Sequence, residues 1–275
     1  MKTALFISPH LDDAAFSCGG TLARLAAENW RTILCTVFTK SVPRPRGFAL
    51  RCQLDKGLSP EINYMKLRRA EDCQAAKILN TSEVLHLNFA EAPHRGYQSA
   101  AELFAEIKKE DEIWRAVAEH LVLLEDIHQP DLIFAPQGLG NHVDHLQTVR
   151  AAREYLAAEK ICWYRDMPYA MRQPNAPTAD LPTGNLSEMP LDISPYLERK
   201  ITACAAYASQ INFQFGGADK LMNALQRFHH SEATRINGGL PLAEVFLTSS
   251  ANQDIFDKGK GANSMDDIEF APDLF

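Results

Sequence analysis

The stretch SPHLDDAAFSCGG, residues 8–20, places two adjacent carboxylates, Asp12 and Asp13, just after His10. A short apolar run, TALFIS at 3–8, precedes them and has the length and composition of a buried strand. Burial and mutual repulsion both oppose two like charges at the end of such a strand. The stretch therefore predicts a strand–helix junction that carries a metal ion or a catalytic task. Capping of the next helix by one aspartate is the alternative at this point.

Similar short apolar runs alternate with amphipathic stretches along most of the chain. Strands are predicted at 3–8, 31–38, 83–89, 131–136, 160–165 and 244–249, and helices at about 19–29, 66–79, 111–128, 143–158, 194–210 and 218–230. This alternation predicts an α/β fold, a Rossmann-like three-layer sandwich with a mostly parallel sheet and helices on both faces. We expect a single domain over residues 1–250, followed by a frayed or extended acidic tail over 251–275.

Two stretches rich in proline are predicted to be irregular, residues 40–62 and residues 172–190. Loops of this length in a compact domain often form lids or bind substrate, although variable surface insertions look the same in a sequence. The adjacent His229 and His230 lie far from the motifs, and we expect them at the surface or at a helix end.

The overall composition excludes several classes of protein. The 275 residues are 46% hydrophobic and carry a net charge of −7, which argues against a nucleic-acid partner. The six cysteines form no CxxC pair, as expected of buried thiols in a reducing compartment. Neither a signal peptide nor a membrane-spanning segment is evident. We therefore expect a cytoplasmic protein with no membrane partner.

A second motif, GLGNHVDHLQTVR at 138–150, follows another predicted strand. His142 and His145 are three residues apart and share a face of the helix predicted there. The apolar positions that continue from His145 point it inward, whereas Asp144 faces elsewhere and suits a supporting role. The carboxyl ends of parallel strands share one edge of a sheet, so this motif and the first are expected to meet. A His, Asp and His set fits a three-ligand metal site, although a hydrogen-bonded core histidine is the alternative.

Together, PHLDDA (9–14) and HVDH (142–145) resemble the motifs of the PIG-L/LmbE-like family of zinc-dependent N-deacetylases. The pair Arg68 and Glu71 is similar to an RxxE pair of that family, and KITACAAYASQ (200–210) is similar to its late helix. The resemblance covers about residues 2–250. Two positions depart from it, because the motif's proline and glutamate are Leu11 and Ala14 in this chain.

The resemblance implies a role for each motif residue. His10, Asp13 and His145 would be ligands of Zn²⁺, with Fe²⁺ as an alternative metal. Asp12 would be the general base, and His142 would stabilise the oxyanion or protonate the leaving amine. The remaining two residues would assist, Asp144 by tuning His142 and Arg68 by contacting substrate. This set is complete for amide hydrolysis without a covalent intermediate.

The resemblance further implies a hydrolase that removes an acetyl group from a small N-acetylated amino sugar or its conjugate, and it allows a homo-oligomer. Three alternatives stay open. They are a family amide hydrolase that acts on another acyl group, a metal- or sugar-binding protein without activity, and an iron(II) oxygenase with two histidines and a carboxylate.

Overall fold

A computed structural model describes residues 1–257 except 177, 180, 182–185 and 238. Within these residues seven strands form one sheet in the order β3-β2-β1-β4-β5-β7-β6. The strands are β1 (Thr3–Ser8), β2 (Arg31–Thr36), β3 (Glu83–His86), β4 (Leu132–Pro136), β5 (Ile161–Tyr164), β6 (Ser187–Asp192) and β7 (Ala243–Thr248). The first five strands pair in parallel, and β7 pairs antiparallel with both β5 and β6.

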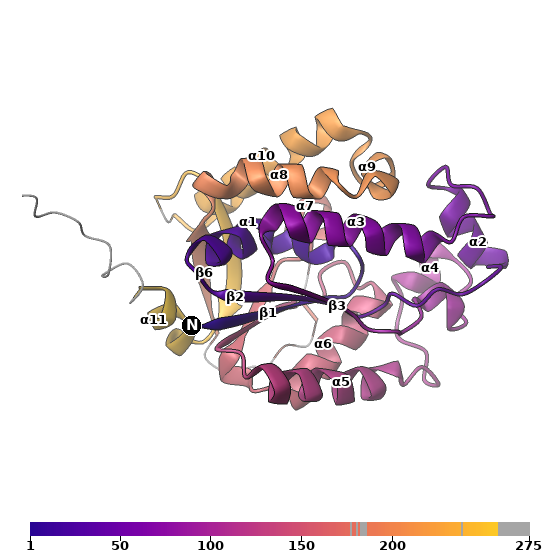
Figure 1. Cartoon of the computed structure of the whole chain (residues 1–275), viewed down its shortest axis with the longest axis horizontal. Coiled ribbons are helices and arrows are strands. Elements are labelled where there is room, and N and C mark those ends of the chain that lie inside the picture. Colours follow the sequence, from indigo (N-terminus) through magenta and orange to yellow (C-terminus); the bar gives the residue numbers. More distant parts are fainter. Residues whose placement is uncertain (177, 180, 182–185, 238, 258–275) are drawn as a thin grey trace, which may run out of the picture.

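Helices cover both faces of this sheet (Figure 1). They are α1 (Asp13–Ala27), α2 (Gly47–Leu54), α3 (Tyr64–Leu79), α4 (Ala100–Leu103), α5 (Ile113–His128), α6 (Val143–Tyr155), α7 (Tyr169–Arg172), α8 (Leu197–Ala205), α9 (Ala208–Phe215), α10 (Ala218–Arg235) and α11 (Ser250–Asp257). Short 3-10 turns add η1 (Ala92–His94), η2 (Ala158–Lys160) and η3 (Ser194–Tyr196). Helices α1, α3, α8 and α10 lie on one side and α5 and α6 on the other (Figure 1). The predicted fold class is confirmed.

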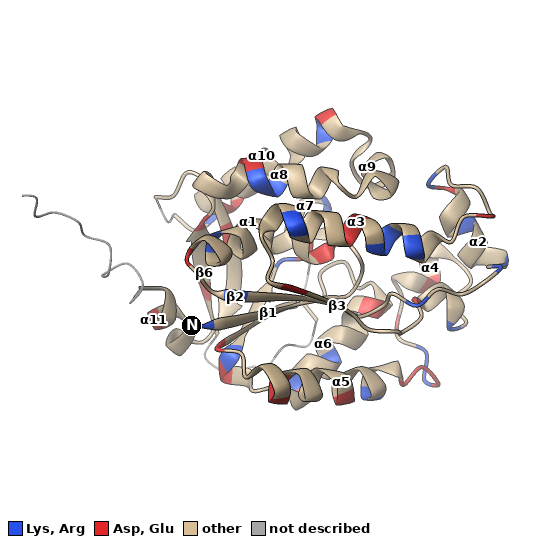
Figure 2. Ribbon diagram, in the orientation of Figure 1, with Lys and Arg blue, Asp and Glu red and all other residues tan. Residues whose placement is uncertain are grey.

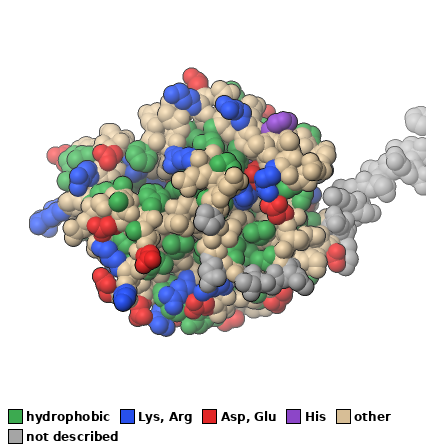
Figure 3. All heavy atoms as spheres, turned by 180° about the vertical axis from the view of Figure 1, so that it is seen from behind, with side chains coloured by type: hydrophobic (Ala, Val, Ile, Leu, Met, Phe, Trp, Pro, Cys, Tyr) green, Lys and Arg blue, Asp and Glu red, His purple; other side chains and the backbone are tan. Residues whose placement is uncertain are grey.

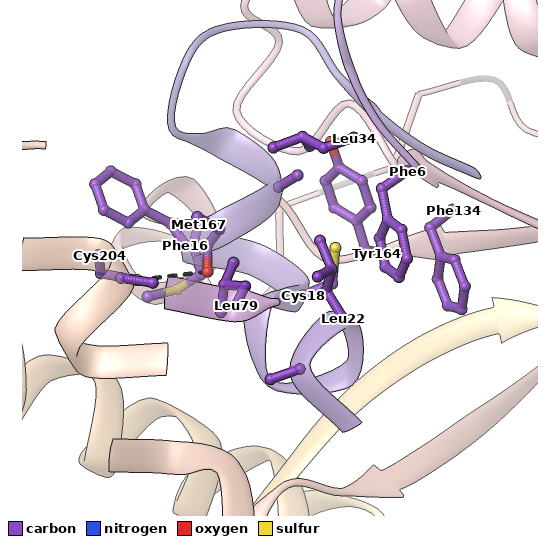
Figure 4. Close-up of a cluster of buried hydrophobic side chains, with 14 of the residues drawn as sticks. Phe6, Phe16, Cys18, Leu22, Leu34, Leu79, Phe134, Tyr164, Met167 and Cys204 are labelled. Carbon is purple, nitrogen blue, oxygen red and sulfur yellow. Dashed lines mark hydrogen bonds between the residues drawn. The ribbon is translucent and has the colours of Figure 1, made fainter. Parts of the chain in front are cut away.

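Each face of the sheet has its own apolar core. On the α1 side, Phe6 of β1 and Phe134 of β4 stack with ring centroids 4.4 Å apart, and Cys18 and Leu22 of α1 pack near Tyr164 of β5 (Figure 4). The opposite face buries a second cluster between β1, β2, β4 and β5 and the helices α5 and α6. Burial on both faces explains why these strands read as continuous apolar runs.

Several element boundaries differ from the predicted ones. Helix α1 begins at Asp13 rather than near residue 19, so the acidic motif itself forms the first turn. Asp13 lies in this first turn, where the helix dipole stabilises a negative charge. The predicted helix over 194–210 is interrupted at Ala206 and Tyr207, which separate α8 from α9.

Three segments that were predicted to be irregular contain regular structure. Within 40–62 lies α2, and the end of 172–190 enters strand β6, although 177, 180 and 182–185 lie outside the described residues. The first part of the predicted tail is helix α11, and residues 258–275 lie outside the described residues. Strand β6 was not predicted because its sequence, SEMPLD, contains proline and acidic residues. It is an edge strand, and edge strands tolerate such residues.

A buried ionic cluster corrects the expectation for His229. Lys200 is fully buried and donates to Oε1 of Glu244 at 2.7 Å and to Nε2 of His229 at 2.8 Å. Glu244 also accepts from the backbone N–H groups of Gly20 and Thr21. His229 is therefore an internal residue that connects α10 to α8 through Lys200 and to β7 through the carbonyl oxygen of Ala243, whereas its neighbour His230 is exposed.

The surface mixes charges of both signs. Basic and acidic residues are interspersed along the ribbon (Figure 2), and the face seen from behind combines both with apolar side chains (Figure 3). Among the described helices, none has the length and apolar character needed to cross a membrane.

Candidate metal centre and active site

Both sequence motifs lie at the same edge of the sheet. The strands β1 and β4 are paired neighbours, and the acidic motif follows β1 while the second motif follows β4. The chain order reverses between these two strands, because β2 and β3 lie on the other side of β1. Ligands of open α/β sheets bind at such a switch point, beyond the carboxyl ends of the strands. In Figure 1 this is the end of β1–β3 that points away from the N-terminus, toward α2 and α4.

Two imidazole rings converge on one carboxylate oxygen. Oδ2 of Asp13 lies 3.1 Å from Nδ1 of His10 and 3.1 Å from Nε2 of His145. The same oxygen accepts from the backbone N–H of His10 at 2.8 Å, which fixes the turn that carries both residues. The predicted trio therefore lies together at a single point.

The far nitrogen of each ring contacts a second carboxylate. Nε2 of His10 donates to Oδ2 of Asp144 at 3.0 Å, and Nδ1 of His145 donates to Oδ1 of Asp166 at 2.6 Å. In the neutral form that a metal ligand requires, these contacts place the proton of each ring on its outer nitrogen. The inner nitrogens then keep their lone pairs, which is how histidine ligands are oriented in protein metal sites.

The donor set fits a divalent metal such as zinc. Nε2 of His145 is buried and makes no hydrogen bond, so it is an orphaned polar atom that faces Asp13. Two imidazole nitrogens and one carboxylate oxygen match the protein ligands of catalytic zinc sites. His142 contributes a further candidate atom, because one ligand atom each of His10, His142 and His145 lie within 4.8 Å of one another.

Without a metal, the charges of the trio compensate one another. Burial would lower the pKa of His10, but its contacts with Asp13 and Asp144 raise it to about 10. Burial likewise opposes the charged form of His145, and Asp13 raises its pKa to about 9. Burial would raise the pKa of Asp13, yet the two histidines hold it well below its usual range. The centre thus attracts positive charge, as a cation site must.

Asp12 has different surroundings from Asp13. It occupies the N-cap position of α1, but its side chain makes no capping hydrogen bond, so the capping alternative is wrong. Oδ1 of Asp12 lies 3.4 Å from Nη2 of Arg68, and the carboxylate is 5% exposed. Burial raises the pKa of Asp12 to about 7, although Arg68 opposes the rise. A carboxyl group with this pKa can accept and release a proton near neutral pH.

Arg68 is held on several sides by the protein. Nη1 donates to Oε1 of Glu91 at 2.7 Å, and Nη2 donates to the carbonyl oxygen of Leu11 at 3.1 Å. Its Nε atom is buried without a hydrogen bond. The bond to Leu11 orders the turn before Asp12. The side chain also lines the cavity that opens over His10, Asp12 and Asp13.

His142 is the N-cap of α6 and lies at the wall of the centre. Its Nδ1 accepts from the backbone N–H of Asp144 at 3.2 Å. Burial, together with the charge of His10, lowers the pKa of His142 to about 3. A neutral ring that accepts at Nδ1 carries its proton at Nε2. His142 therefore offers an N–H donor on its other side.

The side chain of Asp144 binds partners other than the predicted one. Its carboxylate accepts from His10, from Nη1 of Arg95 at 2.7 Å and from the backbone N–H of Ala92 at 3.0 Å. Among the described contacts it makes no hydrogen bond with the His142 ring. Asp144 nevertheless acts on His142, because its backbone N–H donates to Nδ1 of that ring and its charge opposes the lowering of the pKa of His142. The tuning of His142 by Asp144 therefore stays a prediction.

The supporting roles of two further residues were not predicted from the sequence. Asp166 follows β5 at the same sheet edge, and this position was the available signal. Arg95 bridges Asp144 to Asp111, whose carboxylate it also binds at 2.9 Å through Nη2. No periodic pattern marks Arg95 or Asp111, since both lie in irregular segments that only the fold brings together.

A cavity of about 200 Å³ opens over the centre. Its polar floor is formed by the motif residues His10, Asp12, Asp13, His142 and Asp144. Its walls include aromatic side chains from separate elements, namely Phe16, Phe48, Tyr64, Phe104, Tyr169 and Phe213. Aromatic rings beside polar groups suit the apolar faces and hydroxyl groups of a sugar.

Comparisons with known proteins agree with this site. A model of the PIG-L family, described as GlcNAc-PI de-N-acetylase, matches residues 5–156, which hold both motifs. A 2'-N-acetylparomamine deacetylase from Streptomyces fradiae is 31% identical over 211 residues, covering 75% of this chain and 72% of that protein. A 2'-N-acetylparomamine deacetylase from Niallia circulans is 28% identical over 265 residues, covering 90% of each chain.

Solved structures agree as well. The zinc-inhibited form of teicoplanin deacetylase Orf2 has a TM-score of 0.74 to this chain at 25% identity. The likeness covers 90% of this chain and 97% of that one. The family model spans more than half of the sequence and includes every predicted ligand. The chain therefore belongs to the PIG-L family of zinc-dependent deacetylases.

Proposed function

We propose that the protein hydrolyses the acetamide of an N-acetylated amino sugar within a small glycoconjugate, with zinc held by His10, Asp13 and His145. The coarser statement, that the chain is an N-deacetylase of an N-acetylated amino sugar or its conjugate, follows from its family and relatives. One observation carries the mechanism, the convergence of two imidazoles on Asp13 beside a second carboxylate whose pKa is about 7.

Zinc, when bound there, polarises an amide carbonyl and makes water acidic enough to attack it near neutral pH. Asp12 is the proton acceptor in this proposal. It adjoins Asp13 in the chain, it is buried, and its carboxylate is not used for helix capping. Arg68 holds the turn at Leu11 and limits the rise of the pKa of Asp12, which keeps part of the base ionised near pH 7.

His142 is proposed to stabilise the oxyanion. Its Nδ1 is already occupied as an acceptor, so the Nε2–H group is free to donate to a developing negative charge. A single donor of this kind typically contributes about 3 kcal/mol to transition-state stabilisation. The same hydrogen bond argues against His142 as a ligand. While Nδ1 accepts from Asp144, Nε2 carries the proton and has no lone pair to offer to zinc.

The relatives guide the choice of substrate. Both relatives are 2'-N-acetylparomamine deacetylases by name. We therefore propose a small conjugate of an N-acetylated amino sugar as the substrate of this chain. A cytoplasmic location belongs to the same proposal and is supported by the six free cysteines.

Metal-dependent acetate release tests the proposal. The protein would be stripped with a chelator, reloaded with one equivalent of zinc and given 2'-N-acetylparomamine and methyl N-acetylglucosaminide. We expect acetate only from the reloaded protein, with the free amine as the second product. Metal binding without acetate from either compound would contradict the proposal and favour another acyl group or a binding role. Comparison with iron(II) reloading identifies the more active metal.

A further inference from the structure

A small recess lies beyond the carboxyl ends of the neighbouring strands β2 and β3. It has a volume of about 430 Å³ and is lined by Thr39, Lys40, Ser41, Arg69, His86 and Asn88. None of these residues is among those that line the cavity over the metal centre. Ligands of open α/β sheets bind beyond the carboxyl ends of the strands, so this position suits a binding site. We call it the β2–β3 recess.

The wall of the β2–β3 recess is cationic. Lys40, Arg69 and His86 can each carry a positive charge, and no aspartate or glutamate is among the described residues that line it. The protein as a whole has a net charge of −7, so this wall differs in sign from the molecule that carries it. Cations gathered without acidic neighbours at the same surface attract an anion.

Arg69 of α3 lacks the partner that comparable arginines have. Every other buried or half-buried arginine of the described residues forms an ion pair with a carboxylate. The half-buried Arg69 donates instead to the carbonyl oxygen of Thr39 and to Oγ of Ser41. A guanidinium group has five N–H donors, so these two bonds fix its position and leave donors for an anion.

His86 is supported from behind by a buried carboxylate. Its Nε2 lies 2.8 Å from Oδ2 of Asp72, which is 1% exposed and also accepts from the hydroxyl groups of Thr36 and Tyr207. Asp72 therefore holds a proton on Nε2, whereas Nδ1 of His86 has no partner among the described residues. With a second proton on Nδ1, the ring is a charged donor to an anion in the recess.

The other polar side chains of the recess either hold its wall or supply donors. Thr39 donates its hydroxyl proton to a backbone carbonyl oxygen, and Ser41 donates to Oδ1 of Asn63. The side chains of Lys40 and Asn88 make no contact with the described residues, so their N–H groups are available. Lys40, Asn88, Arg69 and His86 thus offer donors from four directions of the chain, which suits a ligand made of acceptors.

We propose that the β2–β3 recess binds phosphate, either as the free ion or as the phosphate group of a phosphomonoester. Lys40, Arg69 and protonated His86 carry three positive charges, and the carboxylate of Asp72 behind them carries one negative charge. The balance of two positive charges matches a phosphate group, which carries a charge of about −1.5 to −2 near pH 7. The fork of Arg69 suits two phosphate oxygens, and Lys40 adds a point charge.

The recess is independent of the metal centre. Arg68 and Arg69 are adjacent on α3, but Arg68 lines the cavity over the metal centre and binds Glu91, whereas Arg69 lines the recess. Phosphate bound beside Arg69 therefore requires neither zinc nor the proposed reaction, and the site goes beyond the proposed function.

Calorimetry with inorganic phosphate tests the proposal, on the zinc-loaded protein and again after a chelator has removed the metal. Lys40→Gln and Arg69→Met each remove one charge of the recess. Lys77→Gln is the matched control, because Lys77 is an exposed residue of the same helix as Arg69 and lines neither the recess nor the cavity over the metal centre. Lys40→Gln removes a side chain without described contacts, so it leaves the fold of the wall unchanged.

We expect the wild type and Lys77→Gln to bind phosphate alike, and to keep this binding after the metal is removed. Lys40→Gln and Arg69→Met should each weaken it by at least about tenfold, the effect of losing one charge-assisted hydrogen bond. Absence of phosphate binding by the metal-free wild type would overturn the proposal. Equal affinity in the wild type and Lys40→Gln would overturn it as well.

Two further ligands identify what the recess recognises. Acetate has one charge and two oxygens, so it should bind at least about tenfold more weakly than phosphate. Acetate that matches phosphate would contradict a phosphate site. Glycerol 3-phosphate distinguishes the two sources of the ligand, because tighter binding than that of inorganic phosphate assigns the recess to a phosphomonoester, and weaker binding assigns it to the free ion.

Discussion

At the scale of single residues, the two adjacent aspartates differ because their partners differ. Asp13 lies between two histidines that hold its pKa well below the usual range, whereas burial raises the pKa of Asp12 to about 7. Neighbouring carboxyl groups with divergent pKa values commonly divide the tasks of ligand and base. The two like charges can therefore stand side by side at the strand end, because only Asp13 is held fully ionised by its neighbours.

The metal ligands were easier to predict from the sequence than the residues that hold them in place. His10, Asp13 and His145 were placed together because each motif follows a strand and strand ends share an edge. The supporting roles of Asp166 and Arg95 were not predicted, because they depend on contacts between segments far apart in the chain. The contacts of the Asp144 carboxylate with His10 and Arg95 were not predicted either, since a spacing does not show the direction of a carboxylate.

Arg95 is predicted to support metal binding through Asp144, which fixes His10. Arg95→Met leaves the buried Asp144 carboxylate without its cation. We expect metal affinity to fall by about 10- to 100-fold, the usual effect of removing a partner behind a ligand. Competition with a chromogenic chelator measures this affinity.

Arg95→Lys should restore part of the affinity, because it keeps the charge. Arg115→Met, at an arginine whose side chain is 56% exposed, serves as the control and should change nothing. Wild-type affinity in Arg95→Met would show that Asp144 orients His10 without this arginine.

At the scale of elements, the strands of the parallel sheet were predicted and the peripheral elements were not. Burial on both faces gives the central strands continuous apolar runs. Helix α2 buries only Ala49 and Gln53, and β6 buries only Met189 and Leu191, on either side of Pro190. Neither carries a clear periodic signal, because their positions depend on docking against the rest of the fold.

The stability of the protein should depend on the glycine at position 20 of helix α1 and not on the glycine at position 19. A Cβ atom added at Gly20 would lie 2.8 Å from Cβ of Ile193 and 2.9 Å from Oε1 of Glu244. We expect Gly20→Ala to lower the free energy of unfolding by about 1–3 kcal/mol through overpacking. Urea denaturation measures the change.

Gly19→Ala is the matched control in the same helix. A Cβ atom there would meet its nearest neighbour at 3.5 Å, an ordinary contact. Alanine should be neutral or should stabilise the helix by up to about 1 kcal/mol. Equal losses at both positions would mean that helix α1 itself, rather than its packing, responds to the change.

At the scale of the whole molecule, a buried ionic cluster connects the last third of the chain to α1, the helix that begins at Asp13. Lys200, His229 and Glu244 come from α8, α10 and β7, and Glu244 accepts from α1 at Gly20. Burial, followed by the charge of Lys200, holds the pKa of His229 well below its usual value. His229 therefore stays neutral in the folded protein.

This histidine predicts a loss of stability in mild acid. The unfolded chain takes up a proton at His229 near pH 6.5, the ordinary value, and the folded protein does not. Stability from this residue is present above that pH and is lost as the pH falls below it. The slope contributed by one proton is at most about 1.4 kcal/mol per pH unit.

The free energy of unfolding of the wild type and His229→Gln, measured between pH 7.5 and 5, tests this prediction. The variant should lose stability less steeply than the wild type as the pH falls. His230→Gln, which changes the exposed neighbour, should keep the slope of the wild type. Identical slopes for all three proteins would show that His229 does not contribute to the loss of stability in acid.

The most direct test of the catalytic centre compares Asp12→Asn with Asp13→Asn, two nearly isosteric changes at adjacent positions. Bound zinc and acetate release would be measured on the same samples. We expect Asp12→Asn to keep zinc and to lose about a hundredfold to ten-thousandfold in turnover, because a base is removed. Asp13→Asn should lose both zinc and turnover. Near-normal turnover in Asp12→Asn, or full zinc binding in Asp13→Asn, would contradict the assignment of base and ligand.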